Sequence, residues 1–215
     1  MSASLRWESM PSGVLSCVGT VVWNENTGSA VLIDPTDDAS TFLDFVRENA
    51  LKPKLLLLTH AHFDHAAGAC DAGRSTGLVP HLHRDDWPLF NELPAWGAKF
   101  GLQAKAPDIA PVHVEHGETL EIEDGFRLQV LHTPGHTQGQ VAYHFSSMGL
   151  VVVGDTLFHG SVGRTDLPGG DADQLVRSIQ RHLYTLPDAT VVVPGHGPHT
   201  SIGREKKSNP FVRAQ

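Results

Sequence analysis

Short apolar runs recur along the chain, and most of them end in a polar residue or a glycine turn. Runs of strand length occupy residues 14–22, 30–33, 55–59, 78–83, 126–132, 141–145, 150–153 and 191–193. Several of these runs are continuously apolar, which is typical of strands that are buried on both faces. The pattern therefore predicts sheets at the centre of the fold with other elements covering them.

Two further segments carry apolar residues at helical spacing. Residues 40–48 begin with a candidate N-cap, Ser40. The apolar face of this predicted helix is formed by Phe42, Leu43, Phe45 and Val46. Residues 173–184 predict a second amphipathic helix, whose apolar face is formed by Leu175, Val176, Ile179 and Leu183. Residues 85–90 also favour a helix, and an Ala/Gly-rich stretch after residue 65 predicts one more.

No linker or low-complexity segment divides the chain. It contains two mixed β/α halves, so we expect an α/β fold in which two mixed sheets pack face to face and are covered by helices. A single domain spanning residues 1–215 suits this length. Residues 91–111 are the least patterned part, with three prolines and two glycines. They fit either a mobile loop beside a site or a plain surface connection.

Charge and composition narrow the class of protein. The formal net charge is −8 and no Lys/Arg run could follow a phosphate backbone, so nucleic acid is not an expected partner. The start lacks the apolar core of a signal peptide, and no run has the length of a membrane span. Cys17 and Cys70 suggest no disulfide framework. We expect a cytoplasmic protein that acts on a small molecule, and its oligomeric state stays open.

Fourteen histidines are the unusual feature of the composition. Three of them, with one aspartate, directly follow the apolar run 55–59 in the order His60-Ala61-His62-Phe63-Asp64-His65. In a short turn, two of these side chains can point to one side and two to the other. Such a turn could hold two divalent ions, which lie roughly 3.5–4 Å apart in two-metal sites.

A purely structural interpretation of this motif is weaker. Asp64 could cap the helix that follows, because Asp is a favoured N-cap residue. Three histidines within six residues are hard to explain in that way, since each buried imidazole needs a hydrogen-bond partner.

Three later strand ends carry the same chemistry. His136 lies in the turn Thr133-Pro134-Gly135-His136-Thr137, Asp155 follows the run 150–153, and His196 follows the run 191–193. Each signal alone is weak, but four clusters at successive strand ends form a strong pattern. Imidazole and carboxylate without thiolate suit zinc, iron or manganese in an open catalytic site.

The order THAHFDH, TPGHT, GDTLF and PGHG resembles the metallo-β-lactamase superfamily over nearly the whole chain. The resemblance implies a four-layer αβ/βα sandwich of two mixed sheets flanked by helices. It also implies two metal ions, most simply zinc, with iron or manganese as alternatives. One ion would be held by His60, His62 and His136 and the other by Asp64, His65 and His196, with Asp155 bridging them.

Within the superfamily, the segments 154–158 and 163–166 are similar to glyoxalase II, and 195–198 resembles its small single-domain relatives. This similarity implies hydrolysis of an S-acyl thioester such as S-lactoylglutathione. Two ions that share a water would make hydroxide available at neutral pH, and the catalytic carboxylates Asp64 or Asp155 could steer it as well as bind metal. Full-length glyoxalase II has a C-terminal helical domain that helps to bind glutathione. No counterpart is expected here, which leaves the thiol open.

Arg164 matches, in the same resemblance, a basic residue that holds a substrate carboxylate. A guanidinium suits that task because it can donate two parallel hydrogen bonds. A surface arginine or an internal salt bridge with Asp166 explains the residue equally well.

Two other functions compete with the hydrolase. A persulfide dioxygenase of the same superfamily would use one iron held by His60, His136 and Asp155, and a non-enzymatic metal-binding scaffold is the third. True β-lactamases of the superfamily are secreted and lack the bridging aspartate, so a lactamase is disfavoured. Among the histidines outside the motifs, His159 is the leading candidate for a role at the site, because it lies just beyond the Asp155 strand. The others are expected to be surface or structural residues: His81, His83, His113, His116, His132, His144, His182 and His199.

Overall fold

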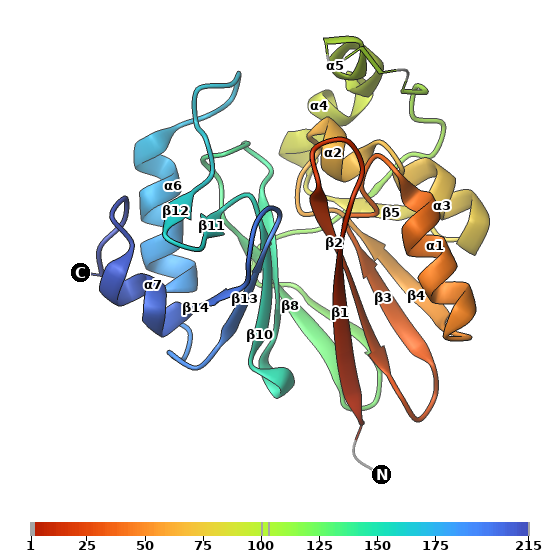
Figure 1. Cartoon of the computed structure of the whole chain (residues 1–215), viewed down its shortest axis with the longest axis horizontal. Helices are drawn as coiled ribbons and strands as arrows, with labels where there is room; N and C mark the ends of the chain where they lie inside the picture. The colour runs from red at the N-terminus through yellow and green to blue at the C-terminus, as the bar shows by residue number, and fades with distance from the viewer. Residues whose placement is uncertain (1–2, 100, 103, 215) are drawn as a thin grey trace. The chain divides into compact units, whose positions relative to one another are not determined.

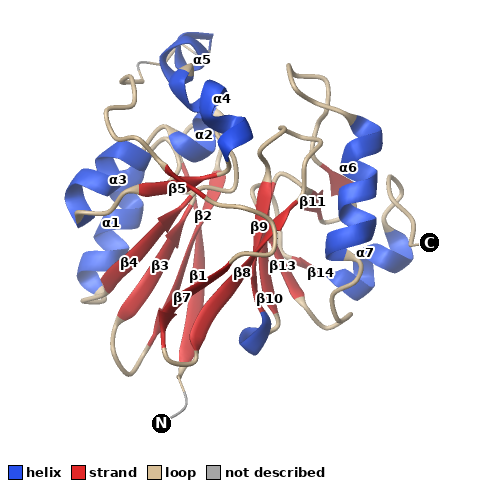
Figure 2. Ribbon diagram, turned by 180° about the vertical axis from the view of Figure 1, so that it is seen from behind, coloured by secondary structure: helices blue, strands red, loops and turns tan. Residues whose placement is uncertain are grey.

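The computed structural model describes residues 3–99, 101–102 and 104–214 and divides into two compact units. The first unit comprises Met1–Val114 and Glu121–Arg127, and the second comprises Glu115–Leu120 and Leu128–Gln215. Each unit is built on a mixed sheet with helices against it (Figures 1 and 2). None of the described helices is long and apolar enough to traverse a bilayer.

The first sheet has six strands in chain order: β1 (Leu5–Ser12), β2 (Cys17–Asn24), β3 (Ser29–Ile33), β4 (Lys52–Leu57), β5 (Pro80–Leu82) and β6 (Val112–His113). Strands β1 to β3 pair antiparallel, whereas β3 to β6 pair parallel. The parallel strands therefore all end at the same edge of the sheet.

Helices α1 (Ala39–Glu48) and α3 (Ala69–Thr76) lie along this sheet beside β3 and β4 (Figure 1). Phe42 and Val46 of α1 pack with Leu32 of β3 and Leu56 of β4 in one buried cluster. The remaining helical segments of the first unit are α2 (Phe63–Ala66), the 3₁₀ turn η1 (Arg84–Asp86), α4 (Trp87–Asn91) and α5 (Leu93–Lys99).

The second sheet has the order β14 (Thr200–Ser201), β13 (Val191–Pro194), β10 (Leu150–Gly154), β9 (Val141–Phe145), β8 (Phe126–His132) and β7 (Thr119–Glu123). Beside it are the hairpin β11 (Leu157–Phe158) and β12 (Ser161–Val162), the 3₁₀ turn η2 (Ser146–Met148), and helices α6 (Ala172–Ser178) and α7 (Ile202–Ser208). Leu175 of α6 and Ile202 of α7 pack in one cluster with Val151 and Val192 of the sheet. The two mixed sheets with helices against them confirm the predicted α/β class.

Three local predictions need correction, and one strand was missed. The strand expected at 14–22 begins at Cys17, because Gly13 and Ser16 adopt positive φ angles and form a turn. Strand β1 was not predicted. The cap of α1 is Asp38, whose side chain accepts from the backbone N–H of Ser40. The helix expected at 173–184 ends at Ser178 and continues as a π-turn, η3 (Ile179–Leu183).

Residues 91–111, predicted to be irregular, contain helix α5. Pro94 stands in the first turn of this helix, where proline is tolerated. Trp96 of α5 has its ring centroid 6.2 Å from that of His62. This segment therefore lies beside the first histidine motif.

We expect Phe42→Ala to destabilise the protein by about 3–5 kcal/mol, because it empties a fully buried position between α1 and the sheet. Phe211→Ala is the matched control, since that ring is 61% exposed, and its effect should stay within about 0.5 kcal/mol. Urea unfolding followed by circular dichroism measures both. Equal losses in the two variants would contradict the assigned packing of α1.

Candidate metal centre

In the first unit, the polar residues of the candidate site lie where neighbouring parallel strands end. Asp34 directly follows β3, the segment 59–65 follows β4, and Asp86 closes the 3₁₀ turn after β5. Because β3, β4 and β5 run parallel, their carboxyl ends meet at one edge, as at the ligand sites of open α/β sheets. The chain topology therefore collects these polar side chains in one place.

Asp34 is a buried carboxylate with three hydrogen-bond donors. Its Oδ1 accepts from the backbone N–H of Thr59 at 2.7 Å, and its Oδ2 accepts from the Thr59 hydroxyl at 2.7 Å. Its Oδ2 also lies 2.9 Å from Nδ1 of His65. The backbone of Asp34 is left-handed, with φ of 51°, a conformation that Asp tolerates better than most residues.

These contacts define which ring nitrogens carry protons. A carboxylate only accepts, so Nδ1 of His65 donates to Asp34 and its Nε2 keeps a lone pair. The Thr59 hydroxyl gives its proton to Asp34 and therefore accepts, at 3.1 Å, from Nδ1 of His60. Both histidines thus present Nε2 as a ligand atom, the arrangement found when the other ring nitrogen of a metal ligand is anchored.

The turn between His60 and His62 is held by a second buried carboxylate. Oδ2 of Asp86 accepts from the backbone N–H of Ala61 at 3.0 Å. Nε2 of His60 and Nδ1 of His62 lie 3.1 Å apart. Two ligands of one tetrahedral ion at about 2.0–2.1 Å stand about 3.3–3.4 Å apart, so this pair fits a shared ion closely.

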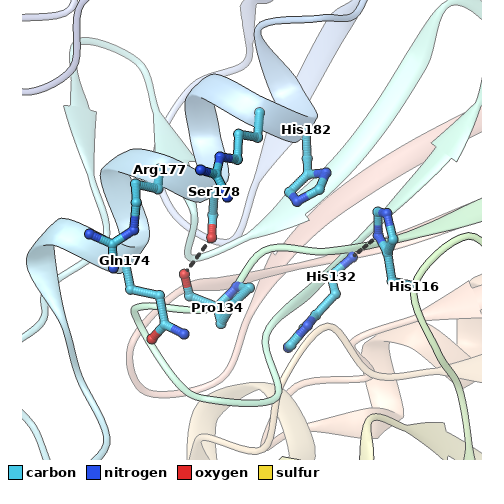
Figure 3. Close-up of a pocket in the computed structure, with 8 residues that line it drawn as sticks. His116, His132, Pro134, Gln174, Arg177, Ser178 and His182 are labelled. Atoms are coloured by element: carbon cyan, nitrogen blue, oxygen red, sulfur yellow. Dashed lines mark hydrogen bonds between the residues drawn. The ribbon is translucent and has the colours of Figure 1, made fainter.

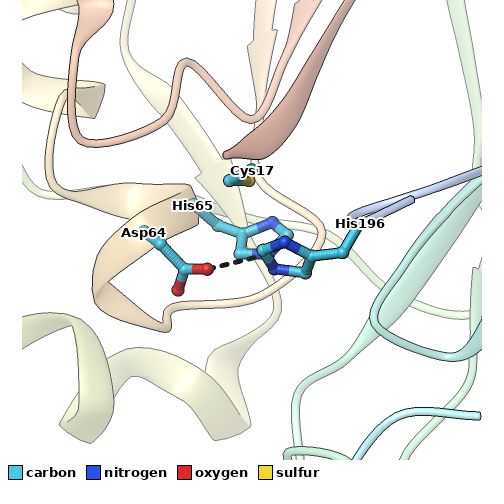
Figure 4. Close-up of side chains that lie close together, drawn as sticks. All are labelled: Cys17, Asp64, His65 and His196. Carbon is cyan, nitrogen blue, oxygen red and sulfur yellow. Dashed lines mark ion pairs between the residues drawn. The ribbon is translucent and has the colours of Figure 1, made fainter. Parts of the chain in front are cut away.

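Asp64 lies in the first turn of α2, and the N-cap position belongs to His62. The capping explanation of Asp64 is therefore wrong. Figure 4 shows the Asp64 carboxylate beside His65, and the distance from Asp64 Oδ2 to His65 Nε2 is 3.8 Å. Asp64 and His65 are both buried, and their ligand atoms lie within 4.8 Å of the Cys17 sulfur.

Cys17 and Cys70 are both buried free cysteines. Burial raises the pKa of the Cys17 thiol to about 12, an effect that the nearby His65 only partly opposes. Cys17 is therefore a neutral thiol beside the imidazole and carboxylate ligands.

In the second unit, three strands that point the same way carry the remaining candidate ligands at their ends. Strands β8, β10 and β13 share one direction, since β9 pairs antiparallel with β8 and β10 while β13 pairs parallel with β10. His136, Asp155 and His196 follow the ends of these three strands.

Asp155 stands between two imidazoles. Its Oδ2 lies 3.5 Å from Nε2 of His136 and 3.7 Å from Nε2 of His196. Both distances exceed the 2.7–3.2 Å typical of N–H···O hydrogen bonds and are close to the spacing of ligands around an ion. The donor set of this unit therefore fits a divalent metal.

His136 is oriented by a backbone carbonyl. Its Nδ1 lies 2.7 Å from the Arg164 oxygen, which only accepts, so Nδ1 carries the proton and Nε2 faces Asp155. Residue 163, which precedes Arg164, must be glycine, because a Cβ on Gly163 would stand 1.9 Å from the backbone oxygen of Asp155. That close approach brings the Arg164 carbonyl within reach of the imidazole.

The Arg164 side chain itself forms an exposed salt bridge. Its Nε donates to Asp166 Oδ1 at 2.7 Å, and a second nitrogen donates to Oδ2 at 2.8 Å. The guanidinium lowers the pKa of the Asp166 carboxyl to about 2. The internal salt bridge that was one of the two sequence interpretations is thus present.

Three supporting residues escaped the sequence analysis: Asp34, Thr59 and Asp86. Asp34 and Asp86 follow the apolar runs 30–33 and 78–83, whose strands neighbour the strand that leads into the histidine motif, and Thr59 ends the run 55–59 itself. Their positions in the chain were the available signal.

We expect Asp34→Asn to weaken metal binding about 10- to 100-fold, the usual effect of losing a group that orients metal ligands. Either orientation of the amide places its NH₂ against a donor, Thr59 on one side or His65 on the other. Zinc competition with a chromogenic chelator measures the affinity. Asp44→Asn, which alters only an exposed pair with Arg47, is the control, and equal affinities in both variants would contradict the role of Asp34.

Comparison with known proteins places this geometry in context. Residues 12–196 match the family described as the metallo-beta-lactamase superfamily. The hydroxyacylglutathione hydrolase GloC of Haemophilus influenzae is 36% identical over 200 residues, which cover 91% of this chain and 92% of that protein.

Two solved structures are similar in both sequence and fold. The B3 metallo-beta-lactamase BLEG-1 superposes with a TM-score of 0.89 at 34% identity and covers 96% of this chain and 99% of its own. TTHA1623 in a di-iron-bound form gives a TM-score of 0.87 at 37% identity, with coverages of 95% and 100%. The predicted fold is therefore confirmed, and the chain belongs to the metallo-β-lactamase superfamily.

Proposed function

We propose that the protein is a metal-dependent hydrolase of glyoxalase II type that cleaves S-acyl thioesters such as S-lactoylglutathione. The proposal draws its substrate class from the similarity to GloC, whose name describes hydroxyacylglutathione hydrolysis. The observation that carries it is the anchoring of Nδ1 in His60, His65 and His136, which leaves Nε2 of each ring for a metal.

The proposed centre holds two divalent ions. One is bound by His60, His62 and His136, the second by Asp64, His65 and His196, and Asp155 bridges them. The position of one Asp155 oxygen between His136 and His196 supports the bridging role. Zinc is the first choice, with iron and manganese as alternatives, and the di-iron relative supports a two-ion centre.

The bound ions would supply a water of lowered pKa and polarise the thioester carbonyl. The protein residues orient the metal ligands and the attacking water. Asp34 and the Arg164 carbonyl keep the ligand rings in the correct tautomer, and the Asp64 and Asp155 carboxylates orient the attacking water. The leaving thiol has a pKa near 8.5, so its thiolate departs without a general acid.

A persulfide dioxygenase is the second candidate, because a relative of 37% identity binds iron, the metal that this function requires, although it binds two iron ions. It would use a single iron on His60, His136 and Asp155. The hydrolase is preferred because the ligands that a single iron does not need (His62, Asp64, His65 and His196) are all present. Cytoplasmic location and a small-molecule substrate are part of the proposal, supported by the two free thiols and by GloC.

We expect the zinc-loaded protein to release thiol from S-lactoylglutathione without oxygen, because zinc has no redox chemistry. A parallel preparation loaded with ferrous iron should consume little oxygen with glutathione persulfide. Elemental analysis of both preparations should give two ions per chain. A chromogenic cephalosporin serves as the control substrate for β-lactamase activity, and we expect it to turn over far more slowly.

Iron-dependent oxygen uptake without thiol release under either metal would overturn the hydrolase in favour of the dioxygenase. At most one bound zinc after saturation would overturn the two-ion centre.

We expect Arg164→Ala to raise KM for a carboxylate-bearing thioester roughly 10- to 100-fold and to change kcat less. The Arg164–Asp166 pair is exposed and weakened by solvent screening, so a substrate carboxylate can replace Asp166. Asp166→Asn is the matched variant and should lower KM, because it removes the competing carboxylate. An unchanged KM in Arg164→Ala would show that the Arg164 side chain has a structural role and does not bind the substrate. Its backbone carbonyl, which orients His136, is retained in the variant.

A further inference from the structure

A cavity of about 350 Å³ opens in the second unit. Its wall comes from the end of β8, the turn that follows it, helix α6 and the π-turn η3 (Figure 3). The lining residues are His116, His132, Pro134, Gln174, Arg177, Ser178, Arg181 and His182. No carboxylate is among them, although the chain as a whole carries a net charge of −8.

Two arginines supply the permanent charge of this cavity. Arg177 and Arg181 lie four residues apart, one in α6 and the other in η3, and therefore face the same side of the helix. Within the part of the chain that the structure describes, neither guanidinium forms a salt bridge with a carboxylate. Both are available to an anionic ligand.

The histidines add oriented donors. Nδ1 of His116 accepts from the backbone N–H of His132 at 3.1 Å, so the proton of the neutral ring is on Nε2. The ring of His182 lies 4.6 Å from that of His116, measured between centroids (Figure 3). Burial lowers the pKa of His182, and its cationic and imidazole neighbours lower it further.

Neutral donors complete the wall. The Gln174 side-chain oxygen accepts from Gln138 at 3.0 Å, which leaves its amide NH₂ to donate. The Ser178 hydroxyl donates to the Pro134 oxygen at 2.7 Å and ties the helix to the turn below (Figure 3).

We propose that this cavity is a binding site for the phosphate group of a small phosphate monoester. The site needs no metal and is independent of the proposed hydrolase function. The cavity volume lies at the lower end of the range of about 300–1,000 Å³ for small-molecule sites, so it has room for a small organic part beside the phosphate.

The donor set favours phosphate over carboxylate. Phosphate offers three strong acceptor oxygens and about −1.5 to −2 charges at neutral pH, whereas a carboxylate offers two oxygens and one charge. Two guanidiniums, an imidazole N–H and an amide NH₂ exceed what one carboxylate can accept. A nearby anion would also offset the mutual repulsion of Arg177 and Arg181, which both line the cavity.

The test is a titration of the full-length, zinc-loaded protein, followed by ¹H–¹⁵N correlation spectra. The probes are inorganic phosphate, phenyl phosphate and acetate. We expect saturable shifts at residues 174–182 and at His116 and His132, with phenyl phosphate binding most tightly and acetate least. Shifts are read residue by residue, so phosphate bound at the metal ligands is distinguished from phosphate in the cavity.

Arg177→Gln and Arg181→Gln should each weaken phosphate binding in the cavity by roughly tenfold or more. Arg127→Gln is the charge-matched control, because Arg127 is exposed at the start of β8 and does not line the cavity. The spectra themselves show that each variant is folded. The proposal is overturned if saturable shifts are absent there, if acetate binds as tightly as phosphate, or if both variants bind like the control.

Discussion

The candidate metal centre depends on one buried carboxylate. Burying a charge is costly unless hydrogen bonds compensate it, and Asp34 has three donors, two from Thr59 and one from His65. Those same bonds determine the tautomers of His60 and His65. The same hydrogen bonds therefore compensate the buried charge of Asp34 and keep the two imidazoles in the tautomer that can bind a metal. A substitution of Asp34 affects both the stability of this part of the fold and the affinity for metal.

In the second unit, the ring of His136 is oriented without a buried charge. His136 is anchored by the backbone carbonyl of Arg164, which has no charge to bury and cannot be mutated away. Its weak point is the backbone approach at Gly163, where any side chain would clash with the Asp155 backbone. Substitutions should thus disturb the first unit through side-chain chemistry and the second through steric exclusion.

Much of this could be predicted from the sequence, because its strongest signals are local. Strands β8 and β9 match their predicted bounds, since each is an uninterrupted apolar or alternating run between clear turns. The ligand motifs are equally local. Strand β1 contains no buried residue and so lacks the apolar run that marks the other strands. Asp34 meets its partners only across 25 and 31 residues of chain, which leaves no local signal.

Helix α6 links the two sites of the second unit. Leu175 packs so closely on the turn 134–136 that a Cβ on Gly135 would stand 2.3 Å from its nitrogen, and the Ser178 hydroxyl is bonded to Pro134. The same helix carries Arg177 toward the cationic cavity. An anion that shifts α6 would therefore move the turn that holds His136. Because Pro134 also lines the cavity, a bound anion meets this turn directly as well as through the helix.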